Sequence, residues 1–175
     1  RGVDKRVIVK NKKDVERFLQ SLEFFNSKDP VNSLREVVSN NDYKNIKKKE
    51  PLVEIICYGL NPNHYHLLLK EIYKGGISEY MKRVGGGYTW YFNNQNRRSG
   101  ALFQGAFKSV RIVSNEQLLH VSAYINLNWK VHKYSGETAV NGRSSWNEYV
   151  GNDNLSICKK EIILDQFNSI KDYEN

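Results

Sequence analysis

Two histidines one residue apart, His64 and His66, are the residues of this chain whose types and spacing best suit chemistry. They open the apolar run at residues 67–69, which predicts a β-strand, and alternate side chains of a strand point to the same side. Two imidazoles on one side can hold a single metal ion. The same pattern also fits two polar side chains that face water, so a metal site needs support from elsewhere in the chain.

A helix further along the chain carries three more candidates. Ser114 and Gln117 form a capping box, which predicts a helix that starts there and runs to about residue 131. On this helix Tyr124 and Asn128 are four residues apart and therefore share a face, with His120 one turn earlier. Packing of Tyr124 in an amphipathic face and termination of the helix by Asn128 are the alternative roles.

If this helix lies across the strand that begins at His64, Tyr124 and Asn128 face the two imidazoles. Two ring nitrogens and an amide oxygen leave open positions on a metal ion for water or a phosphate oxygen. The ion would offset the charge of a phosphodiester, so that the phenol of Tyr124 can attack phosphorus. His120 is expected to be structural or to support the site from behind, since the ligand set is already complete.

The composition predicts a globular protein with a polyanionic partner. The chain has 175 residues, is 39% hydrophobic and carries a formal charge of +8, which suits one domain and contacts with phosphates. Cys57 and Cys158 lie far apart without a Cys-x-x-Cys pair, so neither a disulfide framework nor a cysteine zinc cluster is expected. We therefore expect the protein to be located in a reducing cytoplasm. We expect no membrane span and no secretion signal.

The remaining elements are predicted from hydrophobic periodicity and turn residues. Asn61-Pro62-Asn63 separates two strand-like runs and predicts a hairpin with antiparallel strands. The full set is a helix over 12–26, a connection over 27–50 with a short helix near 34–38, strands over 52–60 and 64–70, a segment over 77–93 that is helical at both ends but interrupted at 85–87, a strand over 102–113, a loop over 133–142 and an amphipathic helix over 154–175.

Cations and aromatic residues interleave between residues 88 and 111. Nucleic acid would contact the four cations Arg97, Arg98, Lys108 and Arg111 through its phosphates. Bases could stack on the neighbouring rings, although packing in the core is the competing role for at least half of them. These rings are Tyr88, Trp90, Tyr91, Phe103 and Phe107.

Three motifs in order, at residues 64–66, 98–108 and 124–128, give the chain a family resemblance. It resembles the HUH single-strand transposases, and more narrowly the REP-associated tyrosine transposases, bacterial relatives of insertion-sequence transposases with one catalytic tyrosine. The resemblance extends from Gly2 to Tyr149. It implies an α+β fold, a ferredoxin-like antiparallel sheet with helices packed on one face, with the catalytic domain over 1–132 and an extension of it over 133–175. The chain does not begin with Met, and we expect the first family strand to lie upstream of Arg1.

The resemblance also implies roles for individual residues. His64 and His66 match the metal-binding histidines, Tyr124 matches the nucleophile and Asn128 matches the third ligand, with Mg²⁺ or Mn²⁺ as the ion. In the family the tyrosine attacks single-stranded DNA near a hairpin, which leaves a 5′-phosphotyrosine and a free 3′-hydroxyl, and strand transfer reverses the attack. One departure is that the family commonly continues its asparagine with proline, whereas Trp129 follows here.

We therefore predict a metal-dependent endonuclease and strand transferase for single-stranded DNA with hairpins, cytoplasmic and associated with the nucleoid. One alternative is a domesticated protein of the same fold that binds DNA hairpins without cutting them. A second is an HUH replication initiator or relaxase, although relaxases usually bring a third histidine to the metal. A third is a metallohydrolase that acts on other substrates without a covalent intermediate. The DNA sequence, the cellular metal and a possible homodimer are left open.

Overall fold

A β-hairpin forms the centre of the fold, in agreement with the prediction. The computed structural model describes residues 1–29, 50–128, 143–151 and 156–174. In it, β1 (Val53–Leu60) and β2 (Tyr65–Glu71) pair antiparallel, with Leu60 opposite Tyr65, and the backbone N–H of Asn61 donates to the His64 carbonyl at 2.8 Å across the turn. β3 (Arg143–Ser144) pairs with the other edge of β1 and completes a 3-stranded sheet in the order β2-β1-β3. The predicted α+β class is confirmed.

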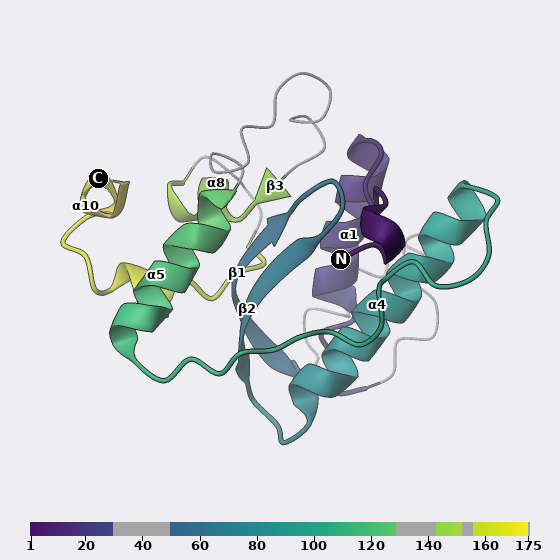
Figure 1. Cartoon of the computed structure of the whole chain (residues 1–175). Helices are drawn as coiled ribbons and strands as arrows, with labels where there is room; N and C mark the ends of the chain where they lie inside the picture. Colours follow the sequence, from purple (N-terminus) through teal and green to yellow (C-terminus); the bar gives the residue numbers. More distant parts are fainter. Residues whose placement is uncertain (30–49, 129–142, 152–155, 175) are drawn as a thin grey trace.

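Two helices cover one face of this sheet. α1 (Lys12–Phe24) starts at Asn11, whose side chain accepts a hydrogen bond from the Asp14 N–H, and it matches the predicted helix over 12–26. It packs beside α4 (Gly76–Gln95), and Figure 1 shows both on the same side of the hairpin. The ring of Phe18 lies 4.9 Å from that of Tyr65, centroid to centroid, so α1 contacts the side chain that β2 presents to this face.

α4 is continuous, so the predicted interruption at residues 85–87 is wrong. Its buried residues Tyr80, Val84, Tyr88 and Phe92 recur every four positions and form one stripe against the sheet and α1. Burial of this stripe outweighs the low helix propensity of three glycines, each of which costs about 1 kcal/mol relative to alanine. Gly87 is also required by packing, because a Cβ there would lie 2.3 Å from Cζ of Phe25.

α5 (Asn115–Asn126) adds a layer on the opposite face of the sheet, across from α1 and α4, whereas we expected helices on one face only (Figure 1). Gly59 permits this contact, because a Cβ at that position would lie 2.9 Å from the carbonyl oxygen of Ile125. Ser114 caps the helix as predicted, accepting from the Gln117 N–H at 3.2 Å. The helix ends at Asn126, with Leu127 as its C-cap, whereas we expected it to reach 131; residues 129–131 lie outside the described part of the chain.

Two further predictions are wrong. Residues 102–113 form no strand: a single bridge joins Phe103 to Gly2, and Val110 and Val113 are each 80% exposed. A strand needs a partner for its backbone groups, and among the described residues the start of the chain pairs with this segment at residues 102–104 alone: the Val3 N–H donates to the Leu102 carbonyl and the Gln104 N–H to the Arg1 carbonyl. The described residues of the predicted helix over 154–175 form two short helices, α9 (Glu161–Leu164) and α10 (Ile170–Glu174), and α8 (Trp146–Tyr149) precedes them.

The short 3-10 helix η1 (Val3–Lys5) lies near the start of the chain. The Lys159 N–H donates to the carbonyl of Ile55 at 2.8 Å, which ties the segment ahead of α9 to β1. The predicted short helix near 34–38 and the predicted loop over 133–142 fall in residues that the structure does not describe. Across the described residues, no helix combines the length and the apolar character needed to cross a bilayer.

The packing of α4 predicts opposite effects for substitutions at two neighbouring glycines. Gly86→Ala places its methyl group in open space and should raise the free energy of unfolding by about 0.5–1 kcal/mol, through helix propensity. Gly87→Ala meets the Phe25 ring and should lower it by about 1–2 kcal/mol, because overpacking forces the ring to move. Urea denaturation of the two variants measures both effects, and equal changes would contradict the packing role of Gly87.

Candidate active site

Alternation along β2 separates the two histidines from the tyrosine between them. The Tyr65 ring lies against Phe18 of α1 and Phe103, with centroids at 4.9 and 5.5 Å. The His64 and His66 rings are on the other side, 5.0 Å apart and nearly perpendicular at 89°. Tyr65 is half-buried and packs against the core, and the desolvation of its phenol raises the pKa to about 12.

Tyr124 lies next to the histidines. Its ring is 5.7 Å from that of His66, at an interplanar angle of 75°, because α5 packs on the face of the hairpin to which the histidines point. The Tyr124 side chain is 42% exposed, so the nucleophile predicted from the sequence is open to a ligand from solvent. The structure thus brings His64, His66 and Tyr124 together. His120, one turn earlier on α5, is exposed.

Asn63 fixes the state of the His64 ring. Nδ1 of His64 is 2.7 Å from Oδ1 of Asn63, which can only accept, so Nδ1 carries the proton and Nε2 is left as an acceptor. Asn63 is held in turn by contacts with the N-terminal segment: its Nδ2 donates to the Lys5 carbonyl at 3.4 Å, and its carbonyl accepts from the Gly2 N–H at 2.8 Å. A ring nitrogen without a proton is the form that binds a metal ion.

Asn128 reaches the histidines through a second amide. Asn128 is buried, at 1% exposure. It lies two residues beyond the end of α5, so it does not share a face of that helix with Tyr124 as predicted. Its Oδ1 accepts from Nδ2 of Asn61 at 2.7 Å, and the same Nδ2 lies 3.3 Å from Nε2 of His64. In the described part of the structure, Nδ2 of Asn128 has no hydrogen-bond partner.

Asn61 and Asn63 were not predicted as site residues. Both belong to the hairpin turn, where asparagine is common because it adopts turn conformations, and that role hid their contacts with His64. The available signal was their distance of three and one residues from a candidate ligand.

The donor set is compatible with a divalent cation. No group of three or more His, Cys, Asp or Glu side chains that could hold a metal is found in the described residues, and in that part of the chain the amide of Asn128 is a further donor near the two imidazoles. Imidazole nitrogen suits transition metals and amide oxygen suits harder ions, and Mn²⁺ accepts both. Nε2 of His64 and Oδ1 of Asn128 are the acceptors that the hydrogen bonds identify for this purpose.

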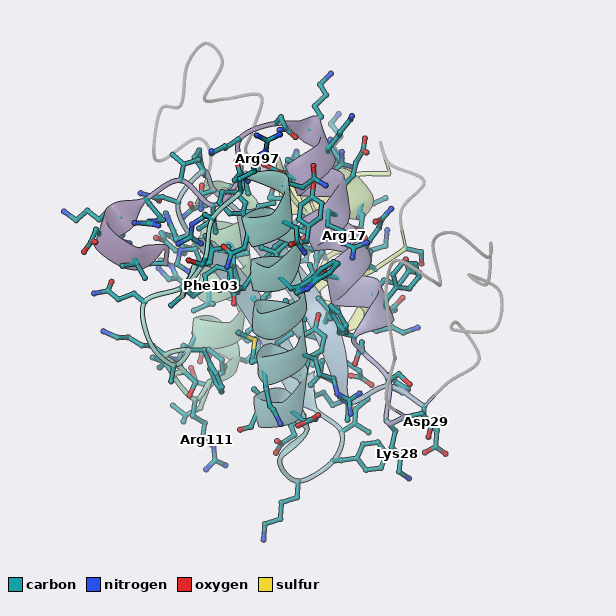
Figure 2. All side chains as sticks on the ribbon, turned by 90° about the vertical axis from the view of Figure 1, so that its right-hand side faces the viewer. Arg17, Lys28, Asp29, Arg97, Phe103 and Arg111 are labelled. Carbon is teal, nitrogen blue, oxygen red and sulfur yellow. The ribbon has the colours of Figure 1, made fainter. Side chains whose placement is uncertain are left out.

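The predicted DNA contacts do not form one cluster. Arg97 is exposed at the end of α4, and Lys108 and Arg111 are exposed on the segment that follows. Figure 2 shows Arg97 near one end of α4 and Arg111 near the other. The guanidinium of Arg98 donates to Oδ1 of Asn93 and to the carbonyl of Ala101, so this side chain also holds the turn after α4.

The five rings expected to stack on bases divide into two groups. Tyr88, Tyr91 and Phe103 belong to the protein interior or pack against it, and the hydroxyl of Tyr88 donates to the Ile8 carbonyl at 2.7 Å. Trp90 is 57% exposed and Phe107 is 39% exposed. These two rings are accessible to a nucleic acid.

Comparison with known proteins identifies the family. A family model described as Transposase IS200 like matches residues 30–128, which is more than half of the chain. The chain belongs to the IS200-like transposase family. The match includes His64, His66, Tyr124 and Asn128, and membership implies an enzyme that cuts and joins DNA. Searches of curated proteins and of solved structures give no match for this IS200-like transposase.

The contact between His64 and Asn63 predicts a defined tautomer. In the wild-type protein the neutral His64 ring should carry its proton on Nδ1, whereas Asn63→Ala should give a mixture of tautomers because the acceptor is gone. Asn63→Asp keeps an acceptor and should restore the wild-type state. Two-bond ¹H–¹⁵N NMR spectra of the ring distinguish the tautomers, and a proton on Nε2 in the wild-type protein would contradict the assignment.

Proposed function

We propose that this transposase is a metal-dependent endonuclease and strand transferase that cuts single-stranded DNA near hairpins through a 5′-phosphotyrosine on Tyr124. The observation that carries the proposal is the contact of the Tyr124 ring with His66, at 5.7 Å, on the face of the sheet where both histidines lie. His64, His66 and Asn128 are the proposed ligands, and Mg²⁺ or Mn²⁺ is the proposed ion.

Each protein group has a distinct part in the proposed reaction. The phenol oxygen of Tyr124 forms a bond to phosphorus as the bond from phosphorus to the 3′ oxygen breaks; that oxygen takes a proton and leaves as a 3′-hydroxyl. A bound divalent ion would offset the charge of the phosphodiester and polarise it for attack. Strand transfer is the reverse: a 3′-hydroxyl attacks the phosphotyrosine and releases the phenol.

Tyr124, rather than Tyr65 of the histidine motif, is the proposed nucleophile because Tyr124 is accessible to DNA. Tyr65 lies between the two histidines, but its ring packs on Phe18 and Phe103 against the core, away from the imidazoles. Tyr124 is 42% exposed, so a DNA strand can approach its ring from solvent while the ring stays next to His66. The exposed His120 could hold the water that accepts the phenol proton, a role that stays a prediction.

The rival function with the same fold is hairpin binding without cleavage. Binding alone needs neither an acceptor at Nε2 of His64 nor a tyrosine beside His66, and the presence of both favours the enzyme. A replication initiator or relaxase would use the same bond chemistry, and membership of the IS200-like family favours a transposase.

A covalent adduct is the direct test of this function. Incubation with a labelled hairpin oligonucleotide and Mn²⁺ should give a protein–DNA adduct that survives denaturing electrophoresis. Tyr124→Phe should abolish the adduct and keep DNA binding, because only the nucleophilic oxygen is lost, and chelation of the metal should have the same effect. Tyr73→Phe is the matched control, since Tyr73 donates to Glu50 at the surface, and it should form the adduct normally. An adduct that persists in Tyr124→Phe would contradict the assignment.

The exposed cations of the segment after α4 should contribute to DNA affinity through phosphates. Lys108→Ala and Arg111→Ala should each weaken binding to a single strand, and each should reduce the slope of log K against log salt by about 0.7, one counterion per contact. Lys28→Ala is the matched control, because Lys28 pairs with Glu50 at 3.2 Å and lies away from Arg111 in Figure 2. Fluorescence anisotropy over a salt series measures the slopes. Equal slopes for all the variants and the wild-type protein would rule out these contacts.

A further inference from the structure

Asn61 occupies the point where the proposed metal ligands meet. Its side chain is buried, at 2% exposure, in the hairpin turn between β1 and β2. The Nδ2 atom donates to Oδ1 of Asn128 at 2.7 Å and lies 3.3 Å from Nε2 of His64. One amide group thus contacts two of the atoms that the proposed function assigns to the ion.

These distances match the spacing of neighbouring ligands around one ion. With metal–ligand bonds of about 2.1 Å in an octahedral site, adjacent ligand atoms are about 3.0 Å apart. The two ends of an asparagine amide have nearly the same shape, and a half-turn of the amide puts Oδ1 where Nδ2 now lies. We infer that the amide oxygen of Asn61 is a further protein ligand of the metal, an inference that rests on the proposed function.

Asn61 also explains how the proposed ligand atoms stay close together when no cation is bound. An oxygen at this place would face the lone pairs of Oδ1 of Asn128 and Nε2 of His64, and the N–H donors of Asn61 remove that repulsion. When a cation supplies the positive charge, the preferred end of the amide is reversed. The backbone of Asn61 is already fixed by its N–H bond to the His64 carbonyl at 2.8 Å, so only the amide has to turn.

A neutral ligand set has a consequence for binding. Two imidazoles and two amides add no negative charge, and no cluster of acidic side chains joins them in the described residues. Affinity for hard divalent ions rises with the number of charged ligands, so this site should bind Mn²⁺ weakly in the absence of DNA. The full charge of the ion is then available to the phosphate of the substrate.

The test is titration calorimetry of Mn²⁺ on the full chain without DNA. Asn61→Leu removes the amide at similar volume and should weaken binding by about tenfold or more, the range seen when groups around a metal are removed. Asn61→Asp replaces the amide by a carboxylate of the same shape, which should tighten binding because a charged oxygen replaces a neutral one. Asn126→Asp is the matched control: this buried amide bonds to Ser145 and Tyr173 instead, and the change should leave Mn²⁺ affinity as in the wild-type protein.

Failure of this inference is distinct from failure of the proposed function. If the wild-type protein binds Mn²⁺ and His66→Ala abolishes binding, unchanged or tighter binding in a folded Asn61→Leu protein would overturn the role of Asn61 alone. If the Asn61→Leu protein does not unfold cooperatively on heating, it is not folded and the Asn61→Asp variant becomes the test. An Mn²⁺ affinity of Asn61→Asp equal to that of the wild-type protein would then overturn the role of Asn61 as a ligand. Mn²⁺ binding that is absent from the wild-type protein, or unaffected by His66→Ala, would overturn the metal assignment and the role of Asn61 with it.

Discussion

The two-residue alternation of β2 is the constraint on which the candidate site depends. A shift of one residue in the pairing with β1 would turn His64 and His66 into the aromatic core and Tyr65 out of it. Two contacts fix the register: Leu60 pairs with Tyr65 at the end of the hairpin, and the Tyr65 ring packs on Phe18 of α1. Packing of the half-buried Tyr65 against the core thus positions two histidines on the opposite face of the sheet.

The hairpin turn is braced by the start of the chain, which links the site to a region far from it in sequence. The Pro62 carbonyl accepts from the N–H groups of Ile8 and Val9 at 2.7 and 3.1 Å, and the Gly2 N–H donates to Asn63 at 2.8 Å. Asn63 in turn holds His64. These hydrogen bonds favour one conformation of the turn, because a change of conformation breaks them. The geometry of the first histidine is therefore set before any ligand arrives.

Local patterns predicted the parts of the molecule that local interactions determine, such as the hairpin and the cap of α5. The glycines around Gly87 led to the wrong prediction of a break in the helix. Their low helix propensity costs less free energy than is gained by burying Tyr88 and the other residues of its stripe. Residues 102–113 were wrongly predicted to form a strand, because the hydrophobic pattern of a segment does not show whether a second strand lies beside it. Asn61 and Asn63 were missed because a turn asparagine looks the same whether or not its amide contacts a histidine. The proximity of Tyr124 to His66 was expected from the sequence and is found.

The central claim is that the paired histidines and Tyr124 serve one cation on the α5 face of the sheet. A crystal structure of the full chain with Mn²⁺, with data collected at the manganese absorption edge, tests it most directly. The account predicts one anomalous peak within bonding distance of Nε2 of His64 and of a ring nitrogen of His66, on the side of the hairpin where Tyr124 lies. Manganese bound elsewhere, with both imidazoles free of it at saturating concentration, would contradict the account.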